Sequence, residues 1–368
     1  MRTRTLLLSL LVCLYLAWQV ESAEILRYVD TGAVAGGNGT TAGTADDGNQ
    51  AYQTLAQWEA ATEQDLTDAG GDFATVHCNR TNGGGVNPNC AINGFTTSEA
   101  CYIAIYGDDF PTDGIFDNTK FYSDGGNAKA CVSVYDDFVK FINLQFQPTA
   151  NDVGSTYGIT VSLQSAGSVI TIDSCIIKGV CSGEGSSYGV FVNDADSTVN
   201  VYNTIVYGFI SSDYPADAGF LAIRGDAGIT NVYNCTVHGN NYGIYRVGGT
   251  LTVKNCAVFN NTNDFNGTIT IDYCASDDGD GTNAQDFTAE ATDWNKVFEN
   301  YAIGDFRLKD YTTSPCCVGV GTDNPGAGLY SDDIAGTART STWDIGAFEY
   351  TVGAPPAAGG QVIMIKEF

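Results

Sequence analysis

The stretch LTVKNCAV, residues 251–258, alternates apolar and polar residues, breaks the alternation once and then resumes it. Leu251 and Val253 fall on one face of an extended strand. Cys256 comes three residues after Val253, so a straight strand would turn it to the opposite face. A bend that ends at Asn255 would restore the facing, because asparagine tolerates the left-handed backbone that such a bend requires. The stretch therefore predicts two short strands joined at a corner, with both apolar sets on one side.

Five related stretches recur along the chain, each with the same break in the alternation. They are VKFINLQF (139–146), ITIDSCII (170–177), VNVYNTIV (199–206), TNVYNCTV (230–237) and ITIDYCAS (269–276). One such unit cannot bury its apolar side chains alone, whereas stacked units bury them between neighbours. The repetition therefore predicts an all-β solenoid in which each stretch lies directly above the next.

Two columns of side chains follow from this stacking. The bend column contains Asn143, Asn203, Asn234 and Asn255, and the next column contains Cys175, Cys235, Cys256 and Cys274. Stacked asparagine side chains can hydrogen bond along the solenoid axis, and buried free cysteines behave as small apolar residues. We therefore expect a structural asparagine ladder beside a buried cysteine column. The pairs Cys316–Cys317 and Cys175–Cys181 stay open as sites of oxidation.

Short strands, a bend within each coil, an asparagine ladder and apolar stacks resemble the right-handed parallel β-helix family, also called the pectin-lyase-like fold. The resemblance covers residues 95–350 and implies a single parallel coil. The ending DIGAFEY (344–350) is similar to the C-terminal end of choice-of-anchor bacterial surface proteins that have a β-helix body. This chain departs from that pattern at Cys316–Cys317, where small apolar residues are usual.

An amphipathic helix is predicted over residues 54–66, TLAQWEAATEQDL. Leu55, Trp58 and Leu66 fall on one helical face, and Thr54, followed three residues later by glutamine, begins a capping box. The two ends of a β-helix expose unpaired strand edges, which favour aggregation unless they are covered. We therefore assign this helix to the N-terminal cap of the solenoid.

The two ends of the chain are expected to lie outside the solenoid. Residues 1–23 combine a basic start, a short apolar run and small residues, which is typical of a secretory signal peptide. Residues 24–94 form an N-terminal region that contains the capping helix. Residues 351–368 combine a Pro/Gly linker with a short apolar tail, which either folds back on the last coil or adds to a neighbouring molecule in head-to-tail self-association. We expect a secreted or cell-surface protein, with no transmembrane helix in the mature chain.

The charge balance limits the classes of partner. The chain has 43 acidic and 16 basic residues and a formal net charge of −27. Such a surface repels nucleic acid and anionic lipids, whereas neutral glycans, cations and other surface proteins remain compatible partners. With only 2 histidines and no pair of cysteines at metal-binding spacing, a zinc site is not expected.

Polysaccharide lyases and glycoside hydrolases occur on the fold that the chain resembles, so their requirements can be compared with the sequence. A lyase needs a base and positive charge for an acidic substrate, and the few basic residues are scattered. A glycosidase needs two facing carboxylates. Asp136, Asp137 and Asp173 are weak catalytic candidates, although aspartate is also common in turns. His77 and His238 are too far apart in coil order to act together. No cofactor is required by this interpretation.

One loop has the composition of a calcium site. Within SDDGDGTNAQD (276–286), the oxygen ligands Asp277, Asp278, Asp280 and Asn283 alternate with glycine. The alternative is a flexible acidic turn that binds no ion. A shift in melting temperature between calcium and chelator would separate the two.

A second repeated phrase begins with Tyr-Gly and supplies the leading functional hypothesis. Tyr157, Tyr188 and Tyr242 begin strands at equivalent positions and are expected to stack in a column. If exposed, such a column binds sugar rings; if buried, it packs beneath a loop. We expect a non-catalytic protein that presents a rigid face to a glycan or to surface proteins. The alternatives are a polysaccharide lyase or glycoside hydrolase, and a self-assembling extracellular subunit.

Overall fold

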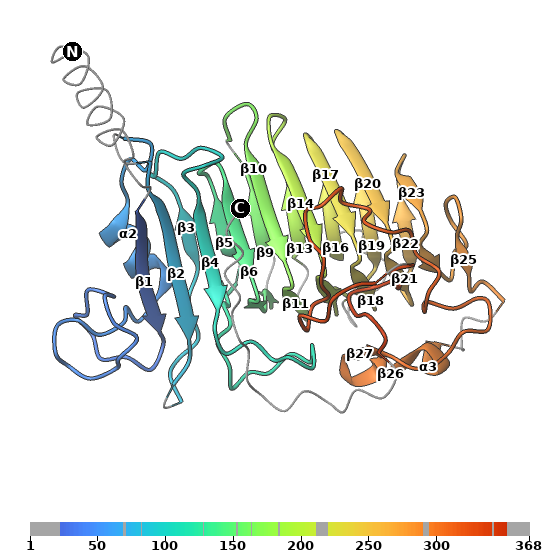
Figure 1. The fold of residues 1–368 in the computed structure, drawn as a ribbon, viewed down its shortest axis with the longest axis horizontal. Helices are drawn as coiled ribbons and strands as arrows, with labels where there is room; N and C mark the ends of the chain where they lie inside the picture. Colours follow the sequence, from blue (N-terminus) through green and yellow to red (C-terminus); the bar gives the residue numbers. More distant parts are fainter. Residues whose placement is uncertain are drawn as a thin grey trace, which may run out of the picture.

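The computed structural model describes residues 23–351, apart from residues 69–70, 82, 128, 152–153, 163, 183–184, 211–219, 290–293 and 341. In this part of the chain, the strands form three long parallel sheets around a common interior (Figure 1). Through most of the coil, successive strands along the chain belong to different sheets, so the polypeptide coils and pairs each strand with its counterpart one turn away. The all-β parallel solenoid predicted from the repeats is confirmed.

Each long sheet collects the equivalent strands of successive coils. Sheet 1 contains β1 (Glu24–Asp30), β2 (Phe73–Asn79), β4 (Ile103–Gly107), β6 (Val139–Ile142), β10 (Val169–Asp173), β14 (Thr198–Tyr202), β17 (Ile229–Tyr233), β20 (Thr250–Lys254) and β23 (Thr270–Asp272). Sheet 2 contains β7 (Gln145–Phe146), β11 (Ile176–Lys178), β15 (Ile205–Tyr207), β18 (Thr236–His238), β21 (Ala257–Phe259), β24 (Ala275–Ser276) and β25 (Gln285–Asp286). Sheet 3 contains β3 (Cys90–Ile92), β5 (Ala130–Val134), β9 (Thr156–Val161), β13 (Ser187–Val192), β16 (Phe220–Gly225), β19 (Tyr242–Arg246) and β22 (Asn263–Asn266). A short parallel pair, β8 (Thr149–Ala150) with β12 (Val180–Cys181), lies between sheets 2 and 3 in chain order.

The bend between sheet 1 and sheet 2 has the predicted left-handed backbone in all six repeats. The bend residues Asn143, Ser174, Asn203, Asn234, Asn255 and Tyr273 have φ values between 47° and 56°. On either side of the bend at Asn255, Leu251 is 2 % exposed, while Val253 and Cys256 are 0 % exposed. The bend therefore keeps both strands facing the interior, as the break in the alternation predicts.

The cysteine and asparagine columns have different surroundings. The column cysteines Cys175, Cys235, Cys256 and Cys274 are free thiols and are fully buried in the coil. The asparagine ladder is only partly internal: Asn255 Nδ2 donates to Asn234 Oδ1 over 3.3 Å. Asn255 and Asn234 also donate to backbone carbonyls of the C-terminal segment, at Thr322 (2.8 Å) and Asp344 (2.8 Å). The ladder therefore also attaches a second layer of chain.

The N-terminal helix is shorter than expected. Helix α2 (Leu55–Thr62) begins after Thr54, whose side chain accepts a hydrogen bond from the Gln57 N–H. It ends before residue 66 because Leu66 N–H donates to the carbonyl of Thr96, which makes that segment a strand-like bridge. Leu55, Trp58 and Leu66 are nevertheless all buried.

The coil also starts earlier than residue 95. Strand β1 pairs in register with β2 from Glu24 to Asp30, and β2 pairs with β4. The segment 24–94 is thus not a separate region before the solenoid, because its strands extend sheet 1. The repeat pattern in the sequence does not identify these coils, because β1 and β2 lack the asparagine bend.

The C-terminal end differs from the predicted solenoid running to residue 350. After β25, the chain forms α3 (Trp294–Val297) and an antiparallel hairpin of β26 (Phe298–Asn300) and β27 (Asp305–Leu308), with a 3-10 turn (Tyr301–Ile303) between its strands. The segment from residue 294 to residue 351, hereafter the strap, then runs back over the outside of the coil (Figure 1).

Aromatic side chains fasten the strap to two sheets. On sheet 2, the Phe259 ring stacks on Phe298 with centroids 5.0 Å apart. On sheet 1, the Tyr202 ring stacks on Tyr330 at 4.5 Å. The strap therefore buries a second apolar layer outside the coil.

The predicted signal peptide and the tail after residue 351 lie outside the described residues. Within the described ranges, no helix is both long and apolar enough to span a membrane.

Candidate functional site

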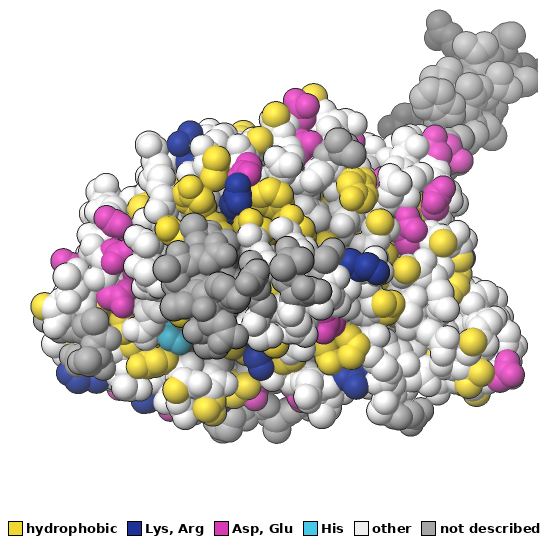
Figure 2. Space-filling model, turned by 180° about the vertical axis from the view of Figure 1, so that it is seen from behind, with side chains coloured by type: hydrophobic (Ala, Val, Ile, Leu, Met, Phe, Trp, Pro, Cys, Tyr) yellow, Lys and Arg dark blue, Asp and Glu magenta, His cyan; other side chains and the backbone are white. Residues whose placement is uncertain are grey.

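The outer face of sheet 3 carries the tyrosines that were expected to bind a ligand. Strand pairing places Tyr157, Tyr188, Leu221 and Tyr242 in one row and Thr160, Phe191, Arg224 and Tyr245 in a second row. We call Tyr157, Tyr188, Phe191, Arg224, Tyr242 and Tyr245 the sheet 3 aromatic face. Seen from behind the coil, hydrophobic side chains gather around basic ones on this side of the molecule (Figure 2).

The glycines in the repeated Tyr-Gly phrase allow adjacent coils to approach each other. A Cβ atom at Gly158 would lie 2.5 Å from the carbonyl oxygen of Gly189, and one at Gly243 would lie 2.6 Å from that of Asp264. No side chain fits at such distances. The glycine in the phrase therefore has a packing role. Of the preceding tyrosines, Tyr157 and Tyr242 are half-buried, whereas Tyr188 is buried.

The aromatic rings of this face stack on one another. Tyr157 and Tyr188 have centroids 5.1 Å apart and planes inclined by 13°, and Phe191 lies 5.3 Å from Tyr157 and 5.2 Å from Tyr188. Tyr242 does not continue this column, because Leu221 lies between it and Tyr188 in the register. It stacks instead on Tyr245 at 5.5 Å. The expected single column is thus two clusters.

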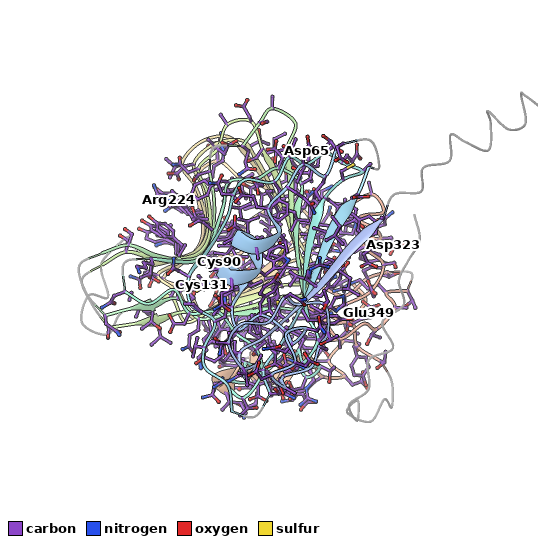
Figure 3. All side chains as sticks on the ribbon, turned by 90° about the vertical axis from the view of Figure 1, so that its left-hand side faces the viewer. Asp65, Cys90, Cys131, Arg224, Asp323 and Glu349 are labelled. Carbon is purple, nitrogen blue, oxygen red and sulfur yellow. The ribbon has the colours of Figure 1, made fainter. Side chains whose placement is uncertain are left out.

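Arg224 lies at the centre of the face and points away from the coil interior (Figure 3). Its guanidinium makes two hydrogen bonds to the Asp226 carboxylate, of 2.7 and 2.8 Å, and donates to the Tyr188 hydroxyl over 3.1 Å. It also lies 5.2 Å from the centroid of the Phe191 ring. Since the pair with Asp226 is neutral overall, this face offers hydrogen-bond donors and acceptors without a net positive charge.

Two of the aspartates considered for catalysis hold turns instead. Asp136 is buried and accepts hydrogen bonds from the backbone N–H groups of Gly94 and Phe95. Burial raises its pKa. Asp137 accepts a hydrogen bond from the N–H of Ser165 over 2.8 Å. Both carboxylates therefore have backbone partners that tie neighbouring coils together.

Asp173, the third catalytic candidate, lies beside the strap. Its carboxylate accepts hydrogen bonds from Ser174 Oγ (2.8 Å) and Asn203 Nδ2 (3.4 Å). Burial raises the pKa of Asp173 to about 7, and repulsion from Asp332 of the strap adds to the rise. Asp173 belongs to the interface between coil and strap.

A buried arginine organises the charged groups of that interface. The Arg339 side chain is fully buried and donates to Asn203 Oδ1 (3.0 Å), to Glu349 Oε2 (3.2 Å) and to the carbonyl of Ala347 (3.1 Å). Asp344 accepts from the N–H groups of Gly319 and Tyr350 within the same segment. The acidic residues of DIGAFEY thus hold the strap in place through hydrogen bonds. The motif therefore has a structural role.

The residues of the predicted calcium loop do not converge on one point. Asp277 accepts from the N–H of Asn260, Asp278 accepts from the N–H of Asp264, and Asn283 donates to Asp272. Among the described residues, no group of three or more His, Cys, Asp or Glu side chains is arranged to hold a metal ion. Burial raises the pKa of Asp280. Calcium binding stays a prediction, and the Asp277 and Asp278 carboxylates accept hydrogen bonds from backbone groups of the preceding coil.

The two histidines have contrasting environments. His238 packs against Phe259 of sheet 2 and against Tyr301 and Phe306 of the strap. Burial lowers its pKa to about 4. His77 is partly exposed, and its Nδ1 lies 2.6 Å from Asp108 Oδ1.

The His77–Asp108 pair was missed at the level of sequence. The two residues are 31 residues apart, which equals the spacing between the repeats that begin at 139 and 170. A search of the sequence for pairs of titratable residues separated by one coil length would therefore have found this pair.

The comparisons with known proteins give limited information. No protein-family profile matches the chain, and no curated protein matches it. A crystal structure of pectate lyase Pel9A is similar over 90 % of this chain and 98 % of that chain, with 14 % sequence identity and a TM-score of 0.35. Because this similarity is low, the assignment of this chain as a parallel β-helix rests on the strand pairing in its own structure.

Proposed function

We propose that this β-helix protein binds a neutral glycan along the sheet 3 aromatic face, outside the cell or at its surface, and that this face is a binding site without catalytic activity. The observation that supports this proposal most directly is the contiguous set of aromatic rings around the Arg224–Asp226 pair. The N-terminal sequence and the DIGAFEY ending support the location.

The chemistry of the face supports a neutral sugar. The Tyr157 ring stacks on the buried Tyr188 ring and is itself half-buried, so part of its surface remains available for contact with a sugar. Arg224 is already neutralised by Asp226, and the net charge of −27 opposes the approach of an acidic polymer. A chain of uncharged sugars lying across adjacent strands fits these properties.

Binding is tested by calorimetry of the full chain against a panel of neutral and acidic oligosaccharides. Tyr157→Ala is expected to weaken binding of the neutral ligand about fivefold, because a ring contact contributes about 1 kcal/mol. Tyr122→Ala is the matched control, since this half-buried tyrosine also packs on a phenylalanine, Phe116, but lies elsewhere.

Two results would count against the proposal. One is equal affinity of the Tyr157→Ala and Tyr122→Ala variants for every ligand that binds. The other is release of reducing ends or of unsaturated sugars by the wild type, which would favour a polysaccharide hydrolase or lyase instead.

A further inference from the structure

A second set of chemically active side chains lies on the outer face of sheet 1, on the opposite side of the coil from Arg224. The strap crosses the later strands of sheet 1 and leaves the outer faces of β1, β2 and β4 open (Figure 1). In register on these three strands lie Tyr28, His77 and Tyr106. The His77 ring stacks on Tyr106 at 5.1 Å and lies 5.8 Å from the ring of Tyr28.

The second feature of this face is the hydrogen bond between His77 and Asp108. Asp108 lies in the turn after β4, and its Oδ1 is 2.6 Å from His77 Nδ1. Because an ionised carboxylate can only accept, Nδ1 carries the proton, and the lone pair of neutral imidazole is on Nε2. The His77 side chain is 19 % exposed and that of Asp108 is 31 % exposed. A base is thus held in one tautomer at the surface.

The packing of the coil does not explain this arrangement. The neighbours of His77 on β2, Val76 and Cys78, point inward and are fully buried. His77 points outward, so its polar atoms contribute nothing to the core. A histidine held on one side by a carboxylate, with its other nitrogen directed away from it, is the arrangement that general-base catalysis uses.

Hydrogen-bond donors lie on the same face. Burial raises the pKa of Tyr106 to about 12, and the nearby Tyr102 and Glu24 add to the rise, so its hydroxyl stays protonated at neutral pH. Lys140 on the next strand, β6, is in register with Ala104 of β4, and its ammonium lies 3.5 Å from the centre of the Tyr102 ring. These groups can stabilise negative charge that develops on an oxygen.

We propose that His77 is the general base of a second site, at which it activates water to hydrolyse an O-acyl ester, and that Asp108 is its positioning residue. His77 Nε2 takes a proton from water while the water oxygen bonds to the acyl carbon. The resulting oxyanion is stabilised by Tyr106 or Lys140. It collapses with loss of the alkoxide, which takes the proton back from Nε2, so that ester and water become acid and alcohol.

Nuclear magnetic resonance of the full chain tests the tautomer, because the chain has only 2 histidines. Neutral His77 is expected to carry its proton on Nδ1 in the wild type, and Asp108→Ala is expected to populate the tautomer with the proton on Nε2. A proton on Nε2 of neutral His77 in the wild type, or an unchanged tautomer in the variant, would overturn the assigned role of Asp108.

Hydrolysis of p-nitrophenyl acetate and release of acetate from an acetylated xylan test the activity. His77→Ala should remove the excess of the wild-type rate over the rate in buffer, a loss of about 10². His238→Gln, checked by its melting curve, is the control and should leave the rate unchanged. Equal rates for wild type and His77→Ala would overturn the proposal. So would a burst from an accumulating acyl-enzyme, which would mean a nucleophile in place of a base.

Discussion

Burial beside the strap makes the ionisation of Asp173 costly for the folded protein. Its pKa is raised to about 7 by burial and by Asp332, against an ordinary value of 3.8. A carboxyl group whose pKa is raised on folding stabilises the fold at low pH, where it is protonated in both states. This contribution is lost as the pH rises from about 4 through 7. The loss is on the order of 2–4 kcal/mol.

Replacing Asp173 by asparagine should remove this pH dependence. Asparagine cannot ionise and keeps an oxygen that can accept from Ser174 and Asn203. We expect Asp173→Asn to unfold at a higher denaturant concentration than the wild type at pH 8 and at the same concentration at pH 4. The exposed Asp196→Asn is the matched control. A wild type and Asp173→Asn variant that differ equally at both pH values would contradict the shifted pKa.

At the scale of elements, the strap is attached to the coil by polar groups as well as by aromatic rings. Arg339 contributes donors to Asn203 of the coil and to Glu349 of the strap, and it contacts the ring of Trp343. Removing the arginine would leave buried acceptors without partners, and breaking a buried ion pair in this way costs about 3–5 kcal/mol. Exposed ion pairs contribute little to stability. We therefore expect Arg339 to contribute more to the attachment of the strap than an exposed ion pair would.

Arg339→Met should release the strap before the coil unfolds. We expect a lower melting temperature and faster proteolysis within residues 320–350, measured by mass spectrometry of the fragments. Arg246→Met is the matched control, because Arg246 makes hydrogen bonds to the carbonyl of Gly249 near the surface. If both variants melt and are cleaved like the wild type, Arg339 does not hold the strap.

At the scale of the whole molecule, the stacked coils and the strap protect the cysteines from solvent. Of the 11 cysteines that the structure describes, all are free and all are buried except Cys181, which is partly exposed. Burial also raises the pKa of thiols such as Cys131 and Cys175. Both effects slow alkylation, since the thiolate is the reactive form.

Brief treatment of the native protein with iodoacetamide should therefore modify Cys181 first. Peptide mass spectrometry should find Cys175, Cys235, Cys256 and Cys274 unmodified until denaturant is added. Rapid native labelling of these column cysteines would contradict the stacked coil.

Local patterns in the sequence predicted the coil but not the strap that covers part of it. The break before Asn255 and its recurrence at Asn203 and Asn234 identified the bends, because each repeat carries the same short-range information. The helix at 54–66 was predicted too long, because pairing of Leu66 with Thr96 outweighs helical spacing. The position of Tyr242 was misjudged because Leu221 comes between it and Tyr188 in the register.

The sequence by itself determined that this chain coils as a parallel solenoid with buried cysteine and bent asparagine columns. These features depend on contacts between identical neighbouring repeats, so periodicity is enough to reveal them. Only the tertiary structure decided that Arg339 binds Asn203 across 136 residues and that Tyr330 stacks on Tyr202. Such contacts join unlike segments once each, and a contact made once leaves no period in the sequence.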